Sequence, residues 1–340
     1  MGYIRGEDIV LGVGVQSSRD TAVEPQMWIP GRTPSGIKPI LEKVMVRETR
    51  GTKMGSQDSE IVQKRAEGDL EFNVRNESIG FIMKSLLGKL ESTTKDGETE
   101  VYRHTVSILP NNPEHPALTI GLHQPDNSDG QDYEYPLGIP VSVSFKIVTN
   151  DLVSATVTFL ASQESEKEGD AYEPVFVTRD YRFRHQDATV KIADDVASLS
   201  GASALSIKEL TVDIPNNGRA DHNISEVEAG NVLGMDITPG GQIVADLIDK
   251  TYHDIFTSGS SKAFQLVLER EDITIGDSSH PRIEIVFPKI TFEGWDPNRA
   301  IDDIVGQTIN FSAHYDASEG EGVSVVIDNE RADYDAESES

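Results

Sequence analysis

Apolar and polar residues alternate in short runs along most of the chain, and this period of two predicts a protein made mainly of β-strands. In one such run Leu70, Phe72 and Val74 alternate with polar residues. Turns rich in Gly, Asn and Pro separate the runs. We expect strands at residues 8–15, 38–46, 70–74, 102–109, 117–122, 141–148, 152–161, 205–214, 242–247, 264–269, 282–287, 308–315 and 323–327. Residues 173–203 are ambiguous, with a strand-like run at 175–184.

Two segments carry helical spacing instead. Ile79, Ile82, Met83 and Leu86 recur at intervals of three or four residues, and Gly88 follows at a position typical of a helix end. A helix of about ten residues is therefore predicted here, from its apolar spacing and its terminal glycine. A second short helix is expected at residues 250–256.

The strand and helix pattern occurs twice. Gly68-Asp-Leu-Glu-Phe-Asn-Val74 is loosely repeated as Gly241-Gln-Ile-Val-Ala-Asp-Leu247, and each is followed by a predicted helix at the same distance. Upstream, Ile37-Lys38 and Val44 align with Ile207-Lys208 and Ile214; downstream, Val143 and Phe145 align with Ile309 and Phe311. Few residues are identical, so a chance alignment is the alternative.

A repeated pattern predicts two similar β-sandwich or barrel domains, each with a short flanking helix. The length of 340 residues is sufficient for two domains of ordinary size. The expected divisions are an N-terminal arm (1–35), a first domain (36–162), a linker with connecting strands (163–203), a second domain (204–316), and a C-terminal strand with an acidic tail (317–340).

The formal net charge of −28 limits the function classes. Binding to phosphate groups needs Lys and Arg to replace counterions, so sequence-specific nucleic-acid binding and anionic membranes are disfavoured. The charge suits solubility, a saline environment, or a conduit that DNA passes without sticking. There is no Cys, which excludes disulfides and thiolate chemistry, and we expect neither a secretory signal nor a membrane-spanning stretch.

No constellation of catalytic or metal-binding residues stands out. His104 and His253 are expected to be ordinary packing or surface residues, since no HExxH spacing is present. The run from Asp126 to Asp132 fails the EF-hand template and predicts a polar turn. Adjacent acids such as Asp194-Asp195 and Asp302-Asp303 are common among 58 acidic residues. We therefore expect no enzyme activity, no cofactor and no metal.

Three motifs carry a resemblance to a known family. They are Tyr135-Pro-Leu-Gly138 with the hairpin that follows at residues 141–159, the opening Leu11-Gly-Val-Gly14 with Trp28-Ile-Pro30, and the ending Val323-Ser-Val-Val-Ile-Asp-Asn329 before Tyr334. With these motifs the chain resembles the tail tube proteins of long-tailed bacteriophages and related archaeal viruses. Each motif is soft, although together they span nearly the whole length.

The resemblance implies a virion protein, made in the host cytoplasm, that assembles as stacked rings around a channel for DNA. Six tube domains usually form a ring, so three copies of a two-domain chain would form a pseudo-hexameric ring. One tube domain with an appended decoration domain is the alternative. Implied partners are further copies of the chain, the tape measure, tail terminator and baseplate hub proteins, and genomic DNA that passes without specific binding; no membrane is implied.

Within this scheme a local basic cluster is a candidate contact between subunits. It lies in a polar stretch at residues 47–67 and consists of Arg47, Arg50, Lys53, Lys64 and Arg65. We expect these cations to meet acidic residues of an adjoining subunit; solvated loop charges, worth about 0–1 kcal/mol each, are the alternative. A competing function is an adhesin, a carbohydrate-binding β-sandwich or a decoration module, although the two Trp residues, Trp28 and Trp295, lie in no aromatic cluster.

Overall fold

The computed structural model describes residues 5–19, 21–51, 53–56, 58–125, 132–299 and 304–335. Within these ranges the chain is mainly β, with nineteen strands and two α-helices, as the alternating pattern predicted. Neither described helix has the length and apolar character needed to cross a membrane.

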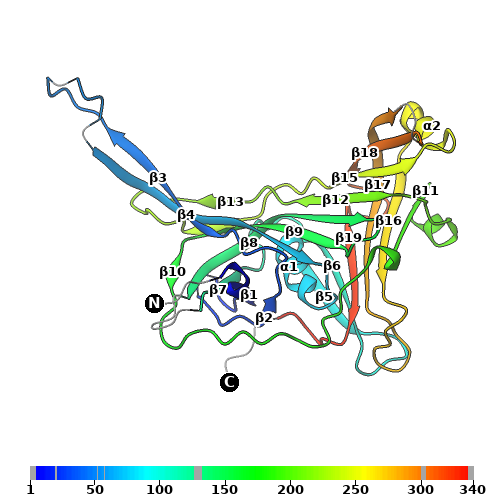
Figure 1. Ribbon diagram of the computed structural model, residues 1–340, viewed down its shortest axis with the longest axis horizontal. Coiled ribbons are helices and arrows are strands. Elements are labelled where there is room, and N and C mark those ends of the chain that lie inside the picture. The colour runs from blue at the N-terminus through cyan, green and yellow to red at the C-terminus, as the bar shows by residue number, and fades with distance from the viewer. Residues whose placement is uncertain are drawn as a thin grey trace.

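Eight strands form one continuous antiparallel sheet that runs through both halves of the chain (Figure 1). Each strand of this sheet pairs with the one that follows it in the spatial order. The order is β3 (Lys38–Val46), β4 (Asp58–Asn73), β9 (Ser154–Ala161), β8 (Tyr133–Val148), β12 (Glu209–Pro215), β15 (Gly240–Asp246), β18 (Gly306–His314) and β17 (Arg282–Asn298). The halves meet where β8 pairs with β12, with Phe145 opposite Val212.

The register of the first four strands recurs in the last four. Gly68 of β4 lies opposite Phe159 of β9, and Gly241 of β15 lies opposite Phe311 of β18. A β-bulge interrupts β8 after Pro140 and β17 after Phe292, at the same place relative to these neighbours. The pairings agree with the sequence alignment of Gly68 with Gly241.

Two other parts of that alignment are wrong. Ile309 and Phe311 lie on β18, which occupies the position of β9, so they do not correspond to Val143 and Phe145 of β8. Upstream, Lys38 lies opposite Glu67 as Asp213 lies opposite Gly240, so the counterpart of Lys38 is Asp213 and not Lys208. Single apolar residues align by chance in both places, because every strand repeats the same alternation.

Nine of the remaining strands form a second layer that encloses the core. They are β1 (Val10–Val15), β2 (Met27–Ile29), β5 (Gly88–Thr94), β6 (Tyr102–Ile108), β7 (Leu118–His123), β10 (Ser165–Glu166), β11 (Ala188–Ala193), β16 (Lys262–Glu269) and β19 (Ser324–Asn329). The predicted N-terminal arm contains β1 and β2, which pair with each other, and β1 also pairs with β7 of the same chain. One cluster of buried side chains contains Phe72 and Phe145 as well as Phe264 and Ile285, so both halves share a core.

Both predicted helices are confirmed, but their surroundings differ. Every residue of α1 (Ser78–Leu87) is buried, and the helix ends at Gly88 in the left-handed conformation (φ 93°). No residue of α2 (Thr251–Ser258), which ends at Gly259 (φ 63°), is fully buried. Sequence spacing predicted both elements, whereas the difference in burial comes from the layers that surround α1.

Three predicted boundaries change. The second part of the polar stretch at 47–67 is strand, because β4 begins at Asp58 and pairs with β3. β8 begins at Tyr133, where β7 and β10 supply partners, so Tyr135-Pro-Leu-Gly138 lies within a strand. The run at 175–184 is not a strand; it makes only isolated bridges, through Arg182 and Arg184. Short elements complete the chain: β13 (Arg219–Asp221), β14 (Asn231–Leu233), η1 (Gly6–Asp8), η2 (His185–Asp187) and η3 (Ala197–Gly201).

The described part of the C-terminal tail makes buried contacts with its own chain. Tyr334 is fully buried, edge-on to Phe81 and to His104. Its hydroxyl donates to the carbonyl oxygen of Glu77 at 2.9 Å and accepts from Asn329 at 2.6 Å. Residues 336–340 lie outside the described part.

A buried carboxyl pair beside this tail should make stability depend on pH. Asp180 accepts the backbone N–H groups of Glu77 (2.8 Å) and Ser78 (3.2 Å) at the start of α1. Burial, and then the nearby Asp180 carboxylate, raise the pKa of Glu77 to about 7 from 4.5. Because the pKa of Glu77 is higher in the folded state than in the unfolded state, Glu77 contributes to stability when it is protonated. This contribution is fully present below the pKa of the unfolded chain and is lost as the pH rises through about 7.

The variant Glu77→Gln tests this effect. The decline in melting temperature of the native chain between about pH 5 and pH 8 should become shallower in the variant, because glutamine needs no proton to remain neutral. Glu100→Gln, at an exposed carboxyl, is the matched control. Parallel pH profiles for native chain and E77Q would contradict the assignment.

Candidate subunit interfaces

The longest projection of the molecule is a two-stranded ribbon formed by β3 and the first part of β4 (Figure 1). β9 pairs with β4 only from Ala66 onward, so the ribbon extends beyond the sheet. We refer to residues 41–64 as the projecting hairpin. Its exposed apolar side chains include Leu41, Val44, Met45, Ile61 and Val62.

These apolar side chains lie on both faces of the hairpin. Val44 and Met45 are neighbours on one strand and therefore point to opposite faces, whereas Val62 on the other strand lies at a β-bulge between Ile61 and Gln63. An isolated two-stranded ribbon is marginally stable in water, and exposed apolar groups on both faces favour burial against another surface. The hairpin therefore has the character of a contact segment.

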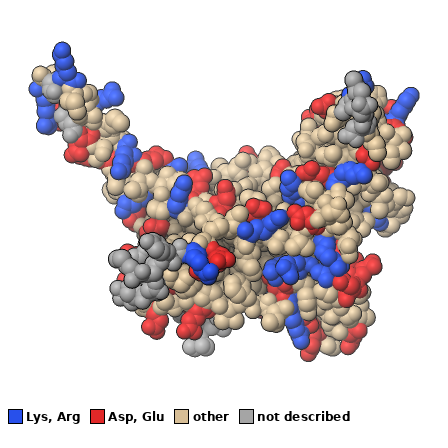
Figure 2. Space-filling model, viewed as in Figure 1, with Lys and Arg blue, Asp and Glu red and all other residues tan. Residues whose placement is uncertain are grey.

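The five predicted cations divide into two groups. Arg47, Arg50 and Lys53 are exposed near the tip, where Figure 2 shows basic side chains gathered, and Arg50 donates to Glu48 at 2.7 Å. Lys64 and Arg65 lie at the base of the hairpin. There Lys64 forms an ion pair with Glu228 at 3.5 Å, and Arg65 binds Glu42 and approaches Glu67 at 3.8 Å. Their predicted role in contacts between subunits stays a prediction.

The two ends of the eight-stranded sheet carry open strand edges. β3 pairs only with β4 among the described strands. At the other end, β16 and β19 pair with the first half of β17 up to Ile290, whereas the second half, from Thr291 to Asn298, pairs only with β18 among the described strands. Unpaired N–H and C=O groups along such edges are able to bind a strand of another chain.

One face of this sheet points away from the core and is polar. Thr158 donates to Asp69 at 2.6 Å, Gln242 donates to Asn310 at 2.9 Å, and Lys146 pairs with Glu209 at 3.3 Å. Alternation assigns to this outer face the acids Glu42, Glu67, Asp69, Glu71, Glu209, Asp213, Asp246 and Asp296, and the bases Lys38, Arg65, Lys146 and Lys289. The outer face is therefore acidic and rich in hydroxyl and amide groups.

The residues considered for chemistry have structural partners. His104 is buried and contacts Asn329 and Ser92, and burial lowers its pKa. His253 lies edge-on to Trp295, and Asp194 forms an ion pair with Lys262. Asp195 accepts the N–H of Ser198 at the start of η3.

The turn expected between Asp126 and Asp132 lies mostly outside the described residues. Asp132 itself is buried and accepts hydrogen bonds from His123, Gln124 and Tyr172. Asp302 and Asp303 also lie outside the described part. Across the described ranges no three His, Asp or Glu side chains group in a way that could hold a metal ion.

Comparison with known proteins decides among the structural and binding functions. A family described as phage tail tube protein matches residues 6–313, which covers both halves of the sheet. The chain belongs to the phage tail tube protein family. It is a structural protein of the virion tail and not an enzyme. A search among curated proteins finds no match.

The tail tube assignment disfavours the adhesin alternative, and the geometry agrees, because Trp28 is buried against Tyr172. Sequence reasoning located the basic cluster but missed the apolar surface of the projecting hairpin. The signal was present in Val44-Met45, near the end of the predicted strand at 38–46, and in Ile61-Val62, inside the stretch that was interpreted as polar. Their significance depends on the hairpin pairing, which residue types alone do not reveal.

Proposed function

We propose that three copies of this chain close into a ring, that rings stack into the tail tube, and that the outer face of the sheet lines the channel. The observation that carries the proposal is the pairing of β8 with β12 inside the chain. By position in the sheet, β17 corresponds to β8 and β3 corresponds to β12. In the ring, β17 of one copy would then pair with β3 of the next copy, just as β8 pairs with β12 inside the chain. Each half of the chain would act as one of two like units.

The internal pairing supplies a register for the junction between copies. Ser144 of β8 lies opposite Asp213 of β12. The bulges align Ser144 with Asp296, and the β3 pairing aligns Asp213 with Lys38. The proposed junction therefore places Asp296 of one copy opposite Lys38 of the next. Opposite charges at facing positions of an antiparallel pair are favourable, and like charges there are destabilising.

The size of the channel supports three copies. Each copy would contribute eight strands. With about 4.8 Å between neighbouring strands and a strand tilt of about 40° to the tube axis, three copies would enclose a channel roughly 40 Å wide between facing side chains. That width accommodates a DNA duplex. Six copies would roughly double the backbone diameter and leave a channel far wider than a duplex needs.

The acidic, hydroxyl-rich outer face suits passage of DNA without binding. Phosphate groups meet few cations there, so counterions would stay with the DNA. Within about 10 Å at 0.1 M salt the carboxylates would repel the duplex and keep it away from the wall. The ends of the tube and its channel would contact the tape measure, tail terminator and baseplate hub proteins.

Charge reversal at the proposed junction tests the ring. Lys38→Glu and Asp296→Lys should each reduce ring formation, because like charges face each other at three junctions per ring, and the double variant should restore it. End-on electron-microscopy averages should show three chains and six lobes in native rings. Matched changes at Lys43 and Glu293 provide the control. Failure of the double variant to recover, or rings of six chains, would overturn the proposed closure.

A further inference from the structure

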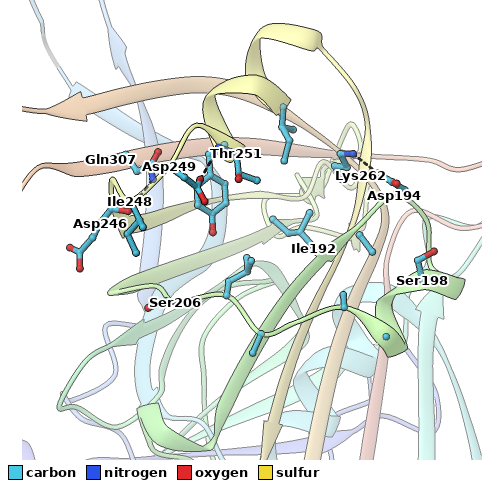
Figure 3. A pocket seen from close by; sticks show the side chains of 17 residues that line it. Ile192, Asp194, Ser198, Ser206, Asp246, Ile248, Asp249, Thr251, Lys262 and Gln307 are labelled. Atoms are coloured by element: carbon cyan, nitrogen blue, oxygen red, sulfur yellow. Dashed lines mark hydrogen bonds and ion pairs between the residues drawn. The ribbon is translucent and has the colours of Figure 1, made fainter.

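A groove beside α2 leaves apolar side chains open to solvent (Figure 3). Its volume is about 600 Å³. Ile192, Leu205, Tyr252 and Ile255 form its apolar wall, and Ile248 at its rim is 79% exposed. We call this hollow the α2 groove.

The groove exists because α2 lacks the cover that α1 has. α1 is enclosed by strands of the second layer and by Tyr334, whose ring lies against Gly80 and Phe81. α2 makes its main contact with β17 alone. Tyr252, Ile255 and Phe256 are therefore only partly buried, an arrangement that favours an additional covering segment.

The α2 groove and the projecting hairpin lie at opposite ends of the sheet. β4 begins at the hairpin, and β15 runs in the same direction as β4, because four antiparallel pairings separate them. β15 ends at Asp246, on the rim of the groove, a few residues before α2 begins. Figure 1 shows the hairpin and α2 at the two ends of the long axis.

We propose that the α2 groove receives the projecting hairpin of a second copy in the next ring, an inference that rests on the proposed stacking of rings. The charges of the hairpin tip and of the groove are complementary, which supports this occupant. Three cations and one carboxylate, Arg47, Arg50, Lys53 and Glu48, lie near the hairpin tip. Three carboxylates and one cation, Asp194, Asp246, Asp249 and Lys262, line the groove.

The number of projecting hairpins in each chain also matches the number of uncovered helices. Within the described residues each chain has one projecting hairpin, since the corresponding segment between β12 and β15 turns back onto its own chain. There Asn216 donates to the carbonyl oxygen of Leu86 at 3.0 Å, and Glu228 pairs with Lys64. Each chain also has one uncovered helix among those described, because α1 is enclosed. A contact between different patches at opposite ends of a subunit is head-to-tail and propagates into a filament.

Crosslinking between engineered cysteines tests the contact without background, because the chain has no Cys. Met45→Cys on the hairpin and Ile248→Cys at the groove are both exposed positions, 62% and 79%. A short bis-maleimide should link assembled M45C/I248C protein into a ladder that extends past three chains. The matched control is M45C/Y315C, since Tyr315 is exposed and follows β18 at the end remote from Gly306 and the groove.

The crosslinking and assembly results together distinguish failure of this contact from failure of the proposed tube. A ladder beyond three chains in M45C/I248C, absent from M45C/Y315C and from the single variants, supports the contact. A ladder that stops at three chains would overturn it by showing a contact within one ring. Dimers of M45C alone would overturn it by showing that hairpins meet each other. Stacked tubes without crosslinks would reject the groove but keep the tube; absence of rings and tubes would reject both.

Discussion

Replacing Tyr334 with alanine should lower the free energy of unfolding by about 3–5 kcal/mol, the range for truncating a fully buried aromatic side chain. The ring fills the space between Phe81 and His104, and its hydroxyl links Asn329 to the carbonyl oxygen of Glu77. Truncation would leave a cavity and two buried polar groups without their partner. Urea denaturation followed by circular dichroism measures the change.

Gly80 provides a control that is specific to this contact. A Cβ at Gly80 would overlap the Tyr334 ring, so Gly80→Ala should also be strongly destabilising. The double variant G80A/Y334A should be more stable than the sum of the two single effects, because alanine at 334 leaves room for the new methyl group. Additive effects, or a loss below about 1 kcal/mol for Y334A, would show that the tail is not anchored there.

Shortening the projecting hairpin should abolish long tubes and leave the fold intact. Replacing residues 42–63 with Asn-Gly would join Leu41 to Lys64, which already lie opposite each other, through a two-residue turn that favours a tight hairpin. The removed residues lie outside the shared core, so the melting temperature should change little. Lys38 is retained, so rings should still close.

Electron microscopy and sedimentation measure the effect of the shortened hairpin. We expect separate rings or short stacks, with at least a tenfold loss of sedimenting tubes, because each stacking contact would lose its apolar and basic partner surface. The charge variant R47E/R50E/K53E keeps the hairpin and should weaken stacking less, with a strong dependence on salt. Tubes of normal length from the shortened chain would show that stacking uses another surface.

Much of the local structure could be predicted from the sequence. Helix α1 and its end at Gly88 followed from apolar spacing and one glycine, and β3 was predicted with the bounds that the structure has. Such features depend on residues close together in the chain. The resemblance to tail tube proteins, carried by soft motifs spread along the chain, was confirmed by the family match.

The pairing partners of the strands were harder to predict from the sequence. Residues 58–67 read as a polar loop because their apolar residues are few, yet pairing with β3 makes them a strand. Residues 175–184 have strand-like composition, yet few backbone partners reach them. A strand exists only where another backbone supplies hydrogen bonds, and that partner is often far away in the sequence.

For the candidate contact residues, too, the sequence located the positions and the structure showed their surroundings. Residue types sufficed to locate the cations, but not to show that Lys64 and Arg65 have partners within the chain while the other three lie near a projecting tip. The predicted domain boundaries stay a prediction. The shared core and the pairing of β8 with β12 show that the halves are not separate bodies.

Local periodicity and composition were enough to define most of the strands, both helices, the absence of thiol chemistry and the acidic character, whereas the family came from the resemblance of a few motifs. Tertiary structure alone decided the order of strands, the register between the halves, the exposed hairpin, the uncovered α2 and the burial of Tyr334. The physical reason is that alternation specifies which side chains face the core, whereas the choice of neighbour depends on packing between distant segments.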